Sequence, residues 1–263
     1  MEKNTTQGSS VSLLKSFEEW KISIGKVLRD KEKTLRDDFS RVHPLGPDVL
    51  SRIIDFAEQG KMIRGGLVCL ADGLATGRVS ADSFTAGAAI ELFQSALLVH
   101  DDIMDRDLYR RGNPSVFHQY ATDARLSSFR DPDHLGEGLG ICAGDIAFFL
   151  GFELLTDLGP QSGSFIKIFS RSARELSYVG IAQMADLLRG ASGPDNLADR
   201  GIAGFLQNED PVSDVLNVYR YKTGRYTFSL PLMLGVSLSD KKADFVPMLE
   251  KRSEERFSRN AET

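Results

Sequence analysis

The sequence predicts an all-α protein with a single domain, and three observations support this prediction. Apolar residues recur at spacings of three and four along most of the chain, which is the period of an amphipathic helix. Alternation with period two is scarce, and the one candidate strand, at residues 219–223, has no partner strand after it. The 263 residues, 41% of them hydrophobic, could form one large core or two small ones, and the absence of a repeat or linker favours one.

The expected helices of the first half follow in order. Residues 13–28 and 49–57 have the apolar spacing of amphipathic helices, and 67–75 continues this pattern after a pair of glycines. The longest expected helix covers residues 80–105 and has a serine or an aspartate at its start as the N-cap. It becomes apolar nearly all round toward its end, which is typical of the central helix of a bundle.

The second half is expected to contain three more helices. They cover residues 141–158, 164–188 and 211–234, and Pro231 should kink or tighten the last of them. The stretch 129–140 before them is polar and rich in Gly and Asp, which indicates a loop.

The two ends of the chain are polar and poor in apolar residues. Residues 1–10 and 250–263 are therefore expected to be disordered, which leaves residues 11–249 as the folded domain.

The composition argues against several classes of protein. The net charge of −5 argues against nonspecific binding to nucleic acid. No run of eighteen apolar residues and no signal peptide is visible, so we expect a cytoplasmic protein without stable membrane insertion. Cys69 and Cys142 lie in apolar runs, match no metal-ligand spacing and are expected to be buried thiols.

Three aspartates near the end of the 80–105 helix form the most informative cluster. Asp101 and Asp105 lie on nearly the same face because a helix turns about 100° per residue, and Asp102 lies beside them. Three unpaired carboxylates repel one another, so a bound cation explains them better than chance acids at a solvated helix end. Oxygen ligands favour Mg²⁺, which usually keeps water and substrate phosphate in its shell, so we expect a phosphorylated substrate.

Two pairs of basic residues are suited to binding an anion. Arg110 and Arg111 follow the aspartates, and guanidinium groups bind phosphate oxygens with two hydrogen bonds, although a salt bridge to the aspartates is the alternative. Lys61 and Arg64 lie in a turn flanked by glycines, which let a backbone approach a ligand at the start of the next helix. Taken alone, this second pair also fits an ordinary charged turn.

Polar residues interrupt two of the later apolar helices. Gln183 and Asp186 share one face, and they either bond to neighbouring helices or face a cavity, because buried polar groups need partners. Lys222, followed by Thr223, puts a cation in a helix that should face the core. It needs an anionic partner there unless its side chain reaches solvent.

Taken in order, these motifs resemble the trans-isoprenyl diphosphate synthase family. The aspartates with the two arginines are similar to the family's first aspartate-rich motif, and the other three pairs resemble its further signatures, over residues 45–238. The resemblance implies the all-α isoprenoid synthase type I fold, an orthogonal helical bundle around a central prenyl-binding cavity. It also implies a Mg²⁺-dependent prenyltransferase, usually a homodimer. Its substrates would be isopentenyl diphosphate and an allylic diphosphate, namely dimethylallyl, geranyl or farnesyl diphosphate.

The resemblance also implies a role for each residue of these motifs. Those that would hold Mg²⁺ on the allylic diphosphate are Asp101, Asp102 and Asp105. Those that would contact the same diphosphate are Arg110, Lys222 and Gln183, with Asp186 on the face of Gln183. Those that would bind isopentenyl diphosphate are Lys61, Arg64 and Arg111, with Gln94 nearby. Thr223 and the backbone of Lys222 would lie beside the forming carbocation.

Product length is partly implied by the residues before the first aspartate. In this family bulky residues there limit the depth of the cavity, whereas Ala96 and Leu97 are not aromatic, as in synthases with products longer than farnesyl. Phe93, one turn deeper, is the expected floor, with plain core packing as the alternative. We therefore expect a geranylgeranyl-class or somewhat longer product.

One family signature is not found in the sequence. The second aspartate-rich motif, which holds a further Mg²⁺, would fall at or beyond Thr263, and Asp240 and Asp244 come too early and lack its pattern. A truncated or frameshifted chain is the favoured explanation, and a natural partner subunit without full activity is the other. Among enzymes, a class I terpene cyclase is the alternative, but its single diphosphate site would leave Lys61 and Arg64 unexplained.

Overall fold

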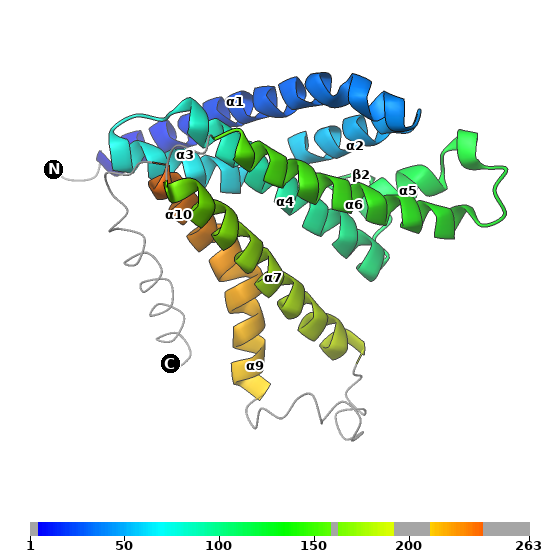
Figure 1. The fold of residues 1–263 in the computed structure, drawn as a ribbon. Coiled ribbons are helices and arrows are strands. Elements are labelled where there is room, and N and C mark those ends of the chain that lie inside the picture. Colours follow the sequence, from blue (N-terminus) through cyan, green and yellow to red (C-terminus); the bar gives the residue numbers. More distant parts are fainter. Residues whose placement is uncertain (1–4, 159–162, 192–210, 239–263) are drawn as a thin grey trace.

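The computed structural model describes residues 5–158, 163–191 and 211–238, and these are mostly helical, which confirms the all-α prediction (Figure 1). The elements before the central hairpin are α1 (Thr5–Val42), α2 (Gly46–Glu58), α3 (Ile63–Thr76) and α4 (Ala81–Asp105). The hairpin and the short helices after it are β1 (Tyr109–Arg110), β2 (Asn113–Pro114), α5 (Val116–Ala121) and η1 (Ala124–Leu126). The remaining elements are α6 (Pro132–Thr156), α7 (Gly163–Ala191), α9 (Pro211–Val218), the π-helix η3 (Tyr219–Ser229) and α10 (Leu230–Ser237).

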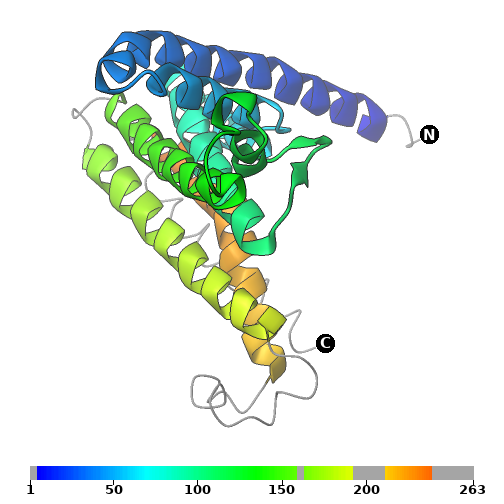
Figure 2. The same cartoon turned by 90° about the vertical axis from the view of Figure 1, so that its right-hand side faces the viewer.

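Helix α4 is the central helix of the bundle, as its sequence predicts. It packs against α1, α2, α3, α5, α6 and α10, and its middle turns are fully buried. Ser80 is its N-cap and accepts a hydrogen bond from the Ser83 N–H at 3.3 Å. Helix α6 runs along α4, and Figure 2 shows α7 beside α6. On its other side α7 packs against η3, so the chain segments around the end of α4 come from distant parts of the sequence.

The loop predicted for residues 129–140 is wrong, because α6 begins at Pro132. Asp131 caps this helix by accepting the His134 N–H at 3.1 Å, and proline is compatible with the first turn. The glycines that indicated a loop instead form a packing face. A Cβ at Gly136 or Gly140 would lie 2.7 Å from atoms of α5, so only glycine allows the two helices to approach so closely.

Four further expectations need correction or restriction. Residues 219–223 lie in η3, so the candidate strand is wrong. Cys69 is buried as predicted, but Cys142 is exposed. Residues 5–10 of the segment expected to be disordered belong to α1, whereas residues 250–263 lie outside the described part of the chain. No membrane span was expected, but among the described residues α6 is long and apolar enough to be one. Core helices of other proteins pass the same test, and α6 packs within the bundle.

Candidate active site

A tight hairpin sends two adjacent arginines in opposite directions. Arg111 and Gly112 form its turn, and both have positive φ, 55° and 80°, as the central residues of a type I′ turn do. Arg110, on β1, turns back to the end of α4, where it contacts Asp101 and Asp102, and it also contacts Asp107, just after the helix. Arg111 instead turns to the α2 end, where its Nη1 donates to the Phe56 carbonyl at 3.3 Å. The salt bridge foreseen for the arginines is therefore present for Arg110.

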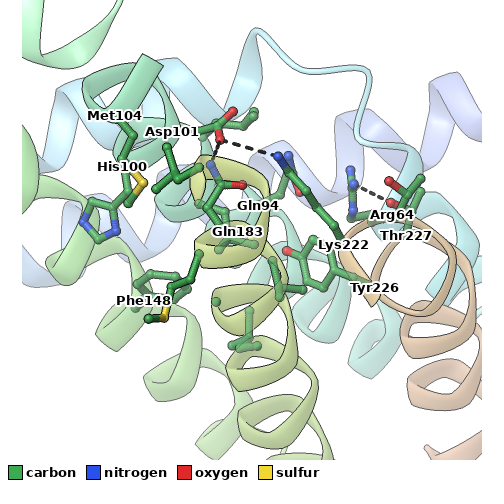
Figure 3. A pocket seen from close by; sticks show the side chains of 18 residues that line it. Arg64, Gln94, His100, Asp101, Met104, Phe148, Gln183, Lys222, Tyr226 and Thr227 are labelled. Carbon is green, nitrogen blue, oxygen red and sulfur yellow. Dashed lines mark hydrogen bonds and ion pairs between the residues drawn. The ribbon is translucent and has the colours of Figure 1, made fainter. Parts of the chain in front are cut away.

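Polar side chains from two other segments, α7 and η3, converge on Asp101 of α4 (Figure 3). The Gln183 side-chain amide, from α7, donates to Asp101 Oδ1 at 2.9 Å. The Lys222 ammonium, from η3, lies 4.0 Å from the same oxygen and 2.6 Å from Asp186 Oδ2. Burial raises the pKa of Asp101, although the positive charge of Lys222 partly offsets this. The pairs identified in α7 and η3 therefore belong to one cluster with the first aspartate.

Asp102 is the buried member of the aspartate cluster. Its side chain has no exposed surface; Oδ1 accepts from Arg110 Nε, and Oδ2 has no hydrogen-bond partner. Burial raises the pKa of this carboxyl to about 6 despite the nearby guanidinium. Asp105 is exposed one helical turn after Asp101.

The chemistry of these aspartates fits a hard cation, although their arrangement is open. Within the described residues no three acidic, His or Cys side chains are grouped closely enough to hold a metal ion. The unpartnered Oδ2 of Asp102 and the all-oxygen donor set nevertheless suit Mg²⁺, which takes one or two carboxylates and completes its shell with water and phosphate. The residues present therefore fit the ion that the sequence predicts.

A second, cationic site lies at the turn between α2 and α3. Lys61 is exposed there, and Met62 turns the chain with a φ of 49°. Arg64, in the first turn of α3, donates through Nη2 to Thr227 Oγ1 of η3 at 2.6 Å. The guanidinium of Arg111 lies so close to Gly60 that a Cβ there would be 3.0 Å from Nη1. Lys61, Arg64 and Arg111, predicted to share one anion, thus lie in one region of the fold although Arg111 is distant in the sequence.

One residue of the cationic site, Arg64, and the polar cluster around Asp101 line one cavity of about 400 Å³. Arg64 and Gln94 line this cavity together with Asp101, Gln183, Lys222 and Thr223. Such a volume is in the range of small-molecule sites. The apolar wall is formed by side chains of α4, α6 and α7, namely Leu97, Leu98, Phe148, Leu176, Val179 and Leu187.

The residues predicted to set the depth of the cavity are divided by the structure. Leu97 lines it, whereas Ala96 and Phe93 are fully buried and are not part of its lining. The Phe93 ring packs 6.4 Å from Phe148 and 4.8 Å from Phe152, both on α6. Of these phenylalanines Phe148 therefore lines the cavity, with Phe93 behind it.

Three residues at the site carry no sequence signal that we used. Tyr226 lines the cavity, is buried, and its hydroxyl has no hydrogen-bond partner. Glu91 is buried one turn before Gln94, and its Oε1 accepts the Gly65 N–H at 2.8 Å. His100 packs on Gly144, where a Cβ would lie 2.3 Å from Nε2. For Glu91 the sequence does contain a signal, because this acid interrupts the apolar face of α4.

The profile of polyprenyl synthetases matches residues 48–253, which is most of the chain. The chain belongs to the polyprenyl synthetase family.

Two relatives of this chain illustrate the similarity. The geranylgeranyl diphosphate synthase of Sulfolobus acidocaldarius is 34% identical over 134 residues, 50% of this chain and 36% of that protein. The (2E,6E)-farnesyl diphosphate synthase of Mycobacterium tuberculosis is 29% identical over 153 residues, 54% of this chain and 38% of that protein. The matched regions therefore span little more than a third of the length of these relatives.

Solved structures of the family share the fold. A geranylgeranyl pyrophosphate synthase from Corynebacterium glutamicum, complexed with isoprenyl diphosphate and magnesium, has a TM-score of 0.69 and 25% identity. The match covers 88% of this chain and 63% of that one. An FPP/GFPP synthase from Zymomonas mobilis has a TM-score of 0.65 and 20% identity, and the match covers 93% of this chain and 76% of that one. The predicted isoprenoid synthase fold is thereby confirmed.

Proposed function

We propose that this polyprenyl synthetase condenses isopentenyl diphosphate with an allylic diphosphate. The observation that carries the proposal is one cavity lined by Asp101 on one side and Arg64 on the other, each of which belongs to a group of residues that could bind a diphosphate. One site combines Asp101 and Asp102 with Arg110, and the other combines Lys61 and Arg64 with Arg111. A terpene cyclase needs only the first site, so the second favours the transferase.

In this proposal the allylic diphosphate lies between α4, α7 and η3. Asp101, Asp102 and Asp105 would hold Mg²⁺, which supplies charge neutralisation of the leaving diphosphate. Arg110, Lys222 and Gln183 would bind the same group, with Asp186 holding the Lys222 ammonium in place. Positive groups fixed where negative charge develops lower the barrier to breaking the allylic C–O bond.

The second substrate would bind at the α2–α3 turn. Lys61, Arg64 and Arg111 would hold the diphosphate of isopentenyl diphosphate, and Gln94 lines the cavity beside them. The double bond of isopentenyl diphosphate would attack the allylic cation. The Thr223 side chain and the Lys222 carbonyl would lie beside this cation. The released diphosphate would accept the departing proton, so the scheme requires no side-chain base. The apolar wall would keep water from the cation.

Three finer properties complete the proposal. We favour a geranylgeranyl-class product because Leu97, one of the positions before Asp101 expected to limit the depth of the cavity, lines it and is not aromatic. By analogy with the family we expect a homodimer acting in the cytoplasm, without nucleic-acid partners. A non-catalytic partner subunit stays the alternative, because the same residues could bind the diphosphates without turnover.

The test compares binding and turnover in site variants. Calorimetry with geranyl diphosphate and MgCl₂, and separately with isopentenyl diphosphate, should show that D101N weakens only the first and K61A only the second. D82N, at the opposite exposed end of α4, should change neither. Elongated product from Mg²⁺, isopentenyl and farnesyl diphosphates supports the transferase. Hydrocarbon from farnesyl diphosphate alone supports a cyclase, and binding without product supports the subunit.

A further inference from the structure

A buried ion pair joins α7 to η3 just outside the cavity. Arg225 Nε donates to Glu175 Oε2 at 3.1 Å, and Arg225 Nη2 donates to Glu175 Oε1 at 2.5 Å. The side chains are only 4% exposed for Glu175 and 13% for Arg225. Neither residue lines the cavity, so the proposed chemistry uses neither of them. Two charges removed from water at this point need an explanation, because their desolvation opposes folding.

Two tyrosines enclose this ion pair. The Arg225 guanidinium lies 5.7 Å from the ring centre of Tyr221 and 6.0 Å from that of Tyr178. The two rings, one from each helix, meet edge to face at 5.5 Å. A planar guanidinium with a bidentate partner and two flanking rings accepts only a narrow range of positions. The cluster of Glu175, Tyr178, Tyr221 and Arg225 therefore fixes η3 against α7 in one register.

The register of η3 decides where Lys222 points. Lys222 follows Tyr221 directly, and its ammonium reaches Asp186 on α7 and Asp101 on α4. A shift of one residue along a helix turns a side chain by roughly a quarter of a turn or more, which would carry this ammonium away from α4. Moreover, π-helices are rare and occur mostly as single turns, frequently at functional sites, so an eleven-residue one needs contacts that hold it.

We propose that Glu175 and Arg225 are positioning residues that hold η3 in the register in which Lys222 faces Asp101. They touch no substrate in this scheme and act through Lys222. Buried ion pairs add little net stability compared with apolar residues, but they select one geometry, which is the property needed here. The inference rests on the proposed function only for the identity of the ligand.

A double-mutant cycle tests whether Arg225 acts through Lys222. Geranyl diphosphate with MgCl₂ is titrated into the wild type, K222A, R225K and the double variant. R225K keeps the charge but loses the bidentate geometry, and each single substitution should raise Kd about tenfold. If Arg225 acts through Lys222, the double variant should bind no more weakly than K222A. Losses that multiply, or an R225K variant that binds like the wild type, would overturn the proposal.

Arg52 provides the matched control. It also lies over a tyrosine, 4.4 Å from the centre of the Tyr120 ring, and bonds to Asp48 at 2.7 Å and Asp123 at 3.0 Å. It belongs to α2 and does not line the cavity. R52K should therefore leave Kd unchanged, alone and in the K222A background, which separates positioning from a general loss of stability.

Hydrogen exchange without ligand distinguishes this inference from the proposed function. R225K and E175Q should accelerate exchange of the amides in 219–229 while α3 and α4 exchange as in the wild type. If that happens and the wild type binds no geranyl diphosphate, the positioning pair is supported and the proposed function fails. Unchanged exchange in 219–229 would overturn the positioning pair whatever the ligand.

Discussion

Glu91 is a carboxylate buried inside the cationic site. It is 5% exposed and accepts the Gly65 N–H in the first turn of α3, with Arg64 and Arg111 nearby. Burial raises its pKa above the ordinary 4.5, because desolvation outweighs the hydrogen bond and the two guanidiniums. The folded protein thus keeps this proton at pH values where the unfolded chain has released it.

This pKa shift makes a prediction about stability. Because the folded state binds the extra proton, the free energy of unfolding should fall as pH rises from 4.5 toward the raised pKa. E91Q keeps an acceptor for Gly65 and should remove that part of the pH dependence. E91L leaves the N–H buried without a partner and should cost about 1–3 kcal/mol. Urea unfolding of the three proteins at pH 5 and pH 8 checks this. If the free energy of unfolding changes equally between the two pH values in E91Q and the wild type, the prediction is contradicted.

Residues with a local motif could be predicted at this scale, and residues defined by distant neighbours could not. The spacing of Asp101, Asp102 and Asp105 is a property of one helix, so the sequence contains it. Tyr226 and Phe148 matter because they border a cavity whose other walls come from α4 and α7. No window of the sequence includes those neighbours.

At the scale of elements, the glycines of α6 explain both a wrong prediction and the packing of the bundle. A Cβ at Gly140 would lie 2.7 Å from Phe117 Cβ and 2.9 Å from Ile103 Cδ1. At Gly138, which is exposed in the same helix, it would meet nothing within 4 Å. Composition alone cannot distinguish a glycine needed for helix contact from one that breaks a helix. The π-helix η3 was equally out of reach, because its register depends on α7.

The two glycines make a matched pair for a prediction. G140A should destabilise the protein by about 1–3 kcal/mol, because the added methyl group overlaps α5 and α4. G138A should stabilise it by about 0.5–1 kcal/mol, since alanine favours a helix where no neighbour interferes. Thermal unfolding of both variants measures the difference. A G140A variant as stable as G138A would show that α5 and α6 do not pack this closely.

At the scale of the whole molecule, the order of the motifs predicted which segments meet, but not how. The adjacent arginines illustrate this, because a turn with two positive φ values sends one to each site. The fold class and the central place of α4 followed from periodicity. The depth of the cavity did not, because it depends on which aromatic ring of α4 or α6 faces inward.

That depth gives the last prediction. Phe148 lines the cavity, whereas Phe93, the floor expected from the sequence, packs behind it with no exposed surface. F148A should therefore lengthen the cavity and improve binding of geranylgeranyl over geranyl diphosphate. F93A should leave that ratio unchanged and cost about 3–5 kcal/mol of stability as a core truncation. Calorimetric Kd values with both ligands and MgCl₂ decide this without requiring turnover, and product length decides it where turnover is observed. A ratio that changes with F93A and not with F148A would return the floor to Phe93.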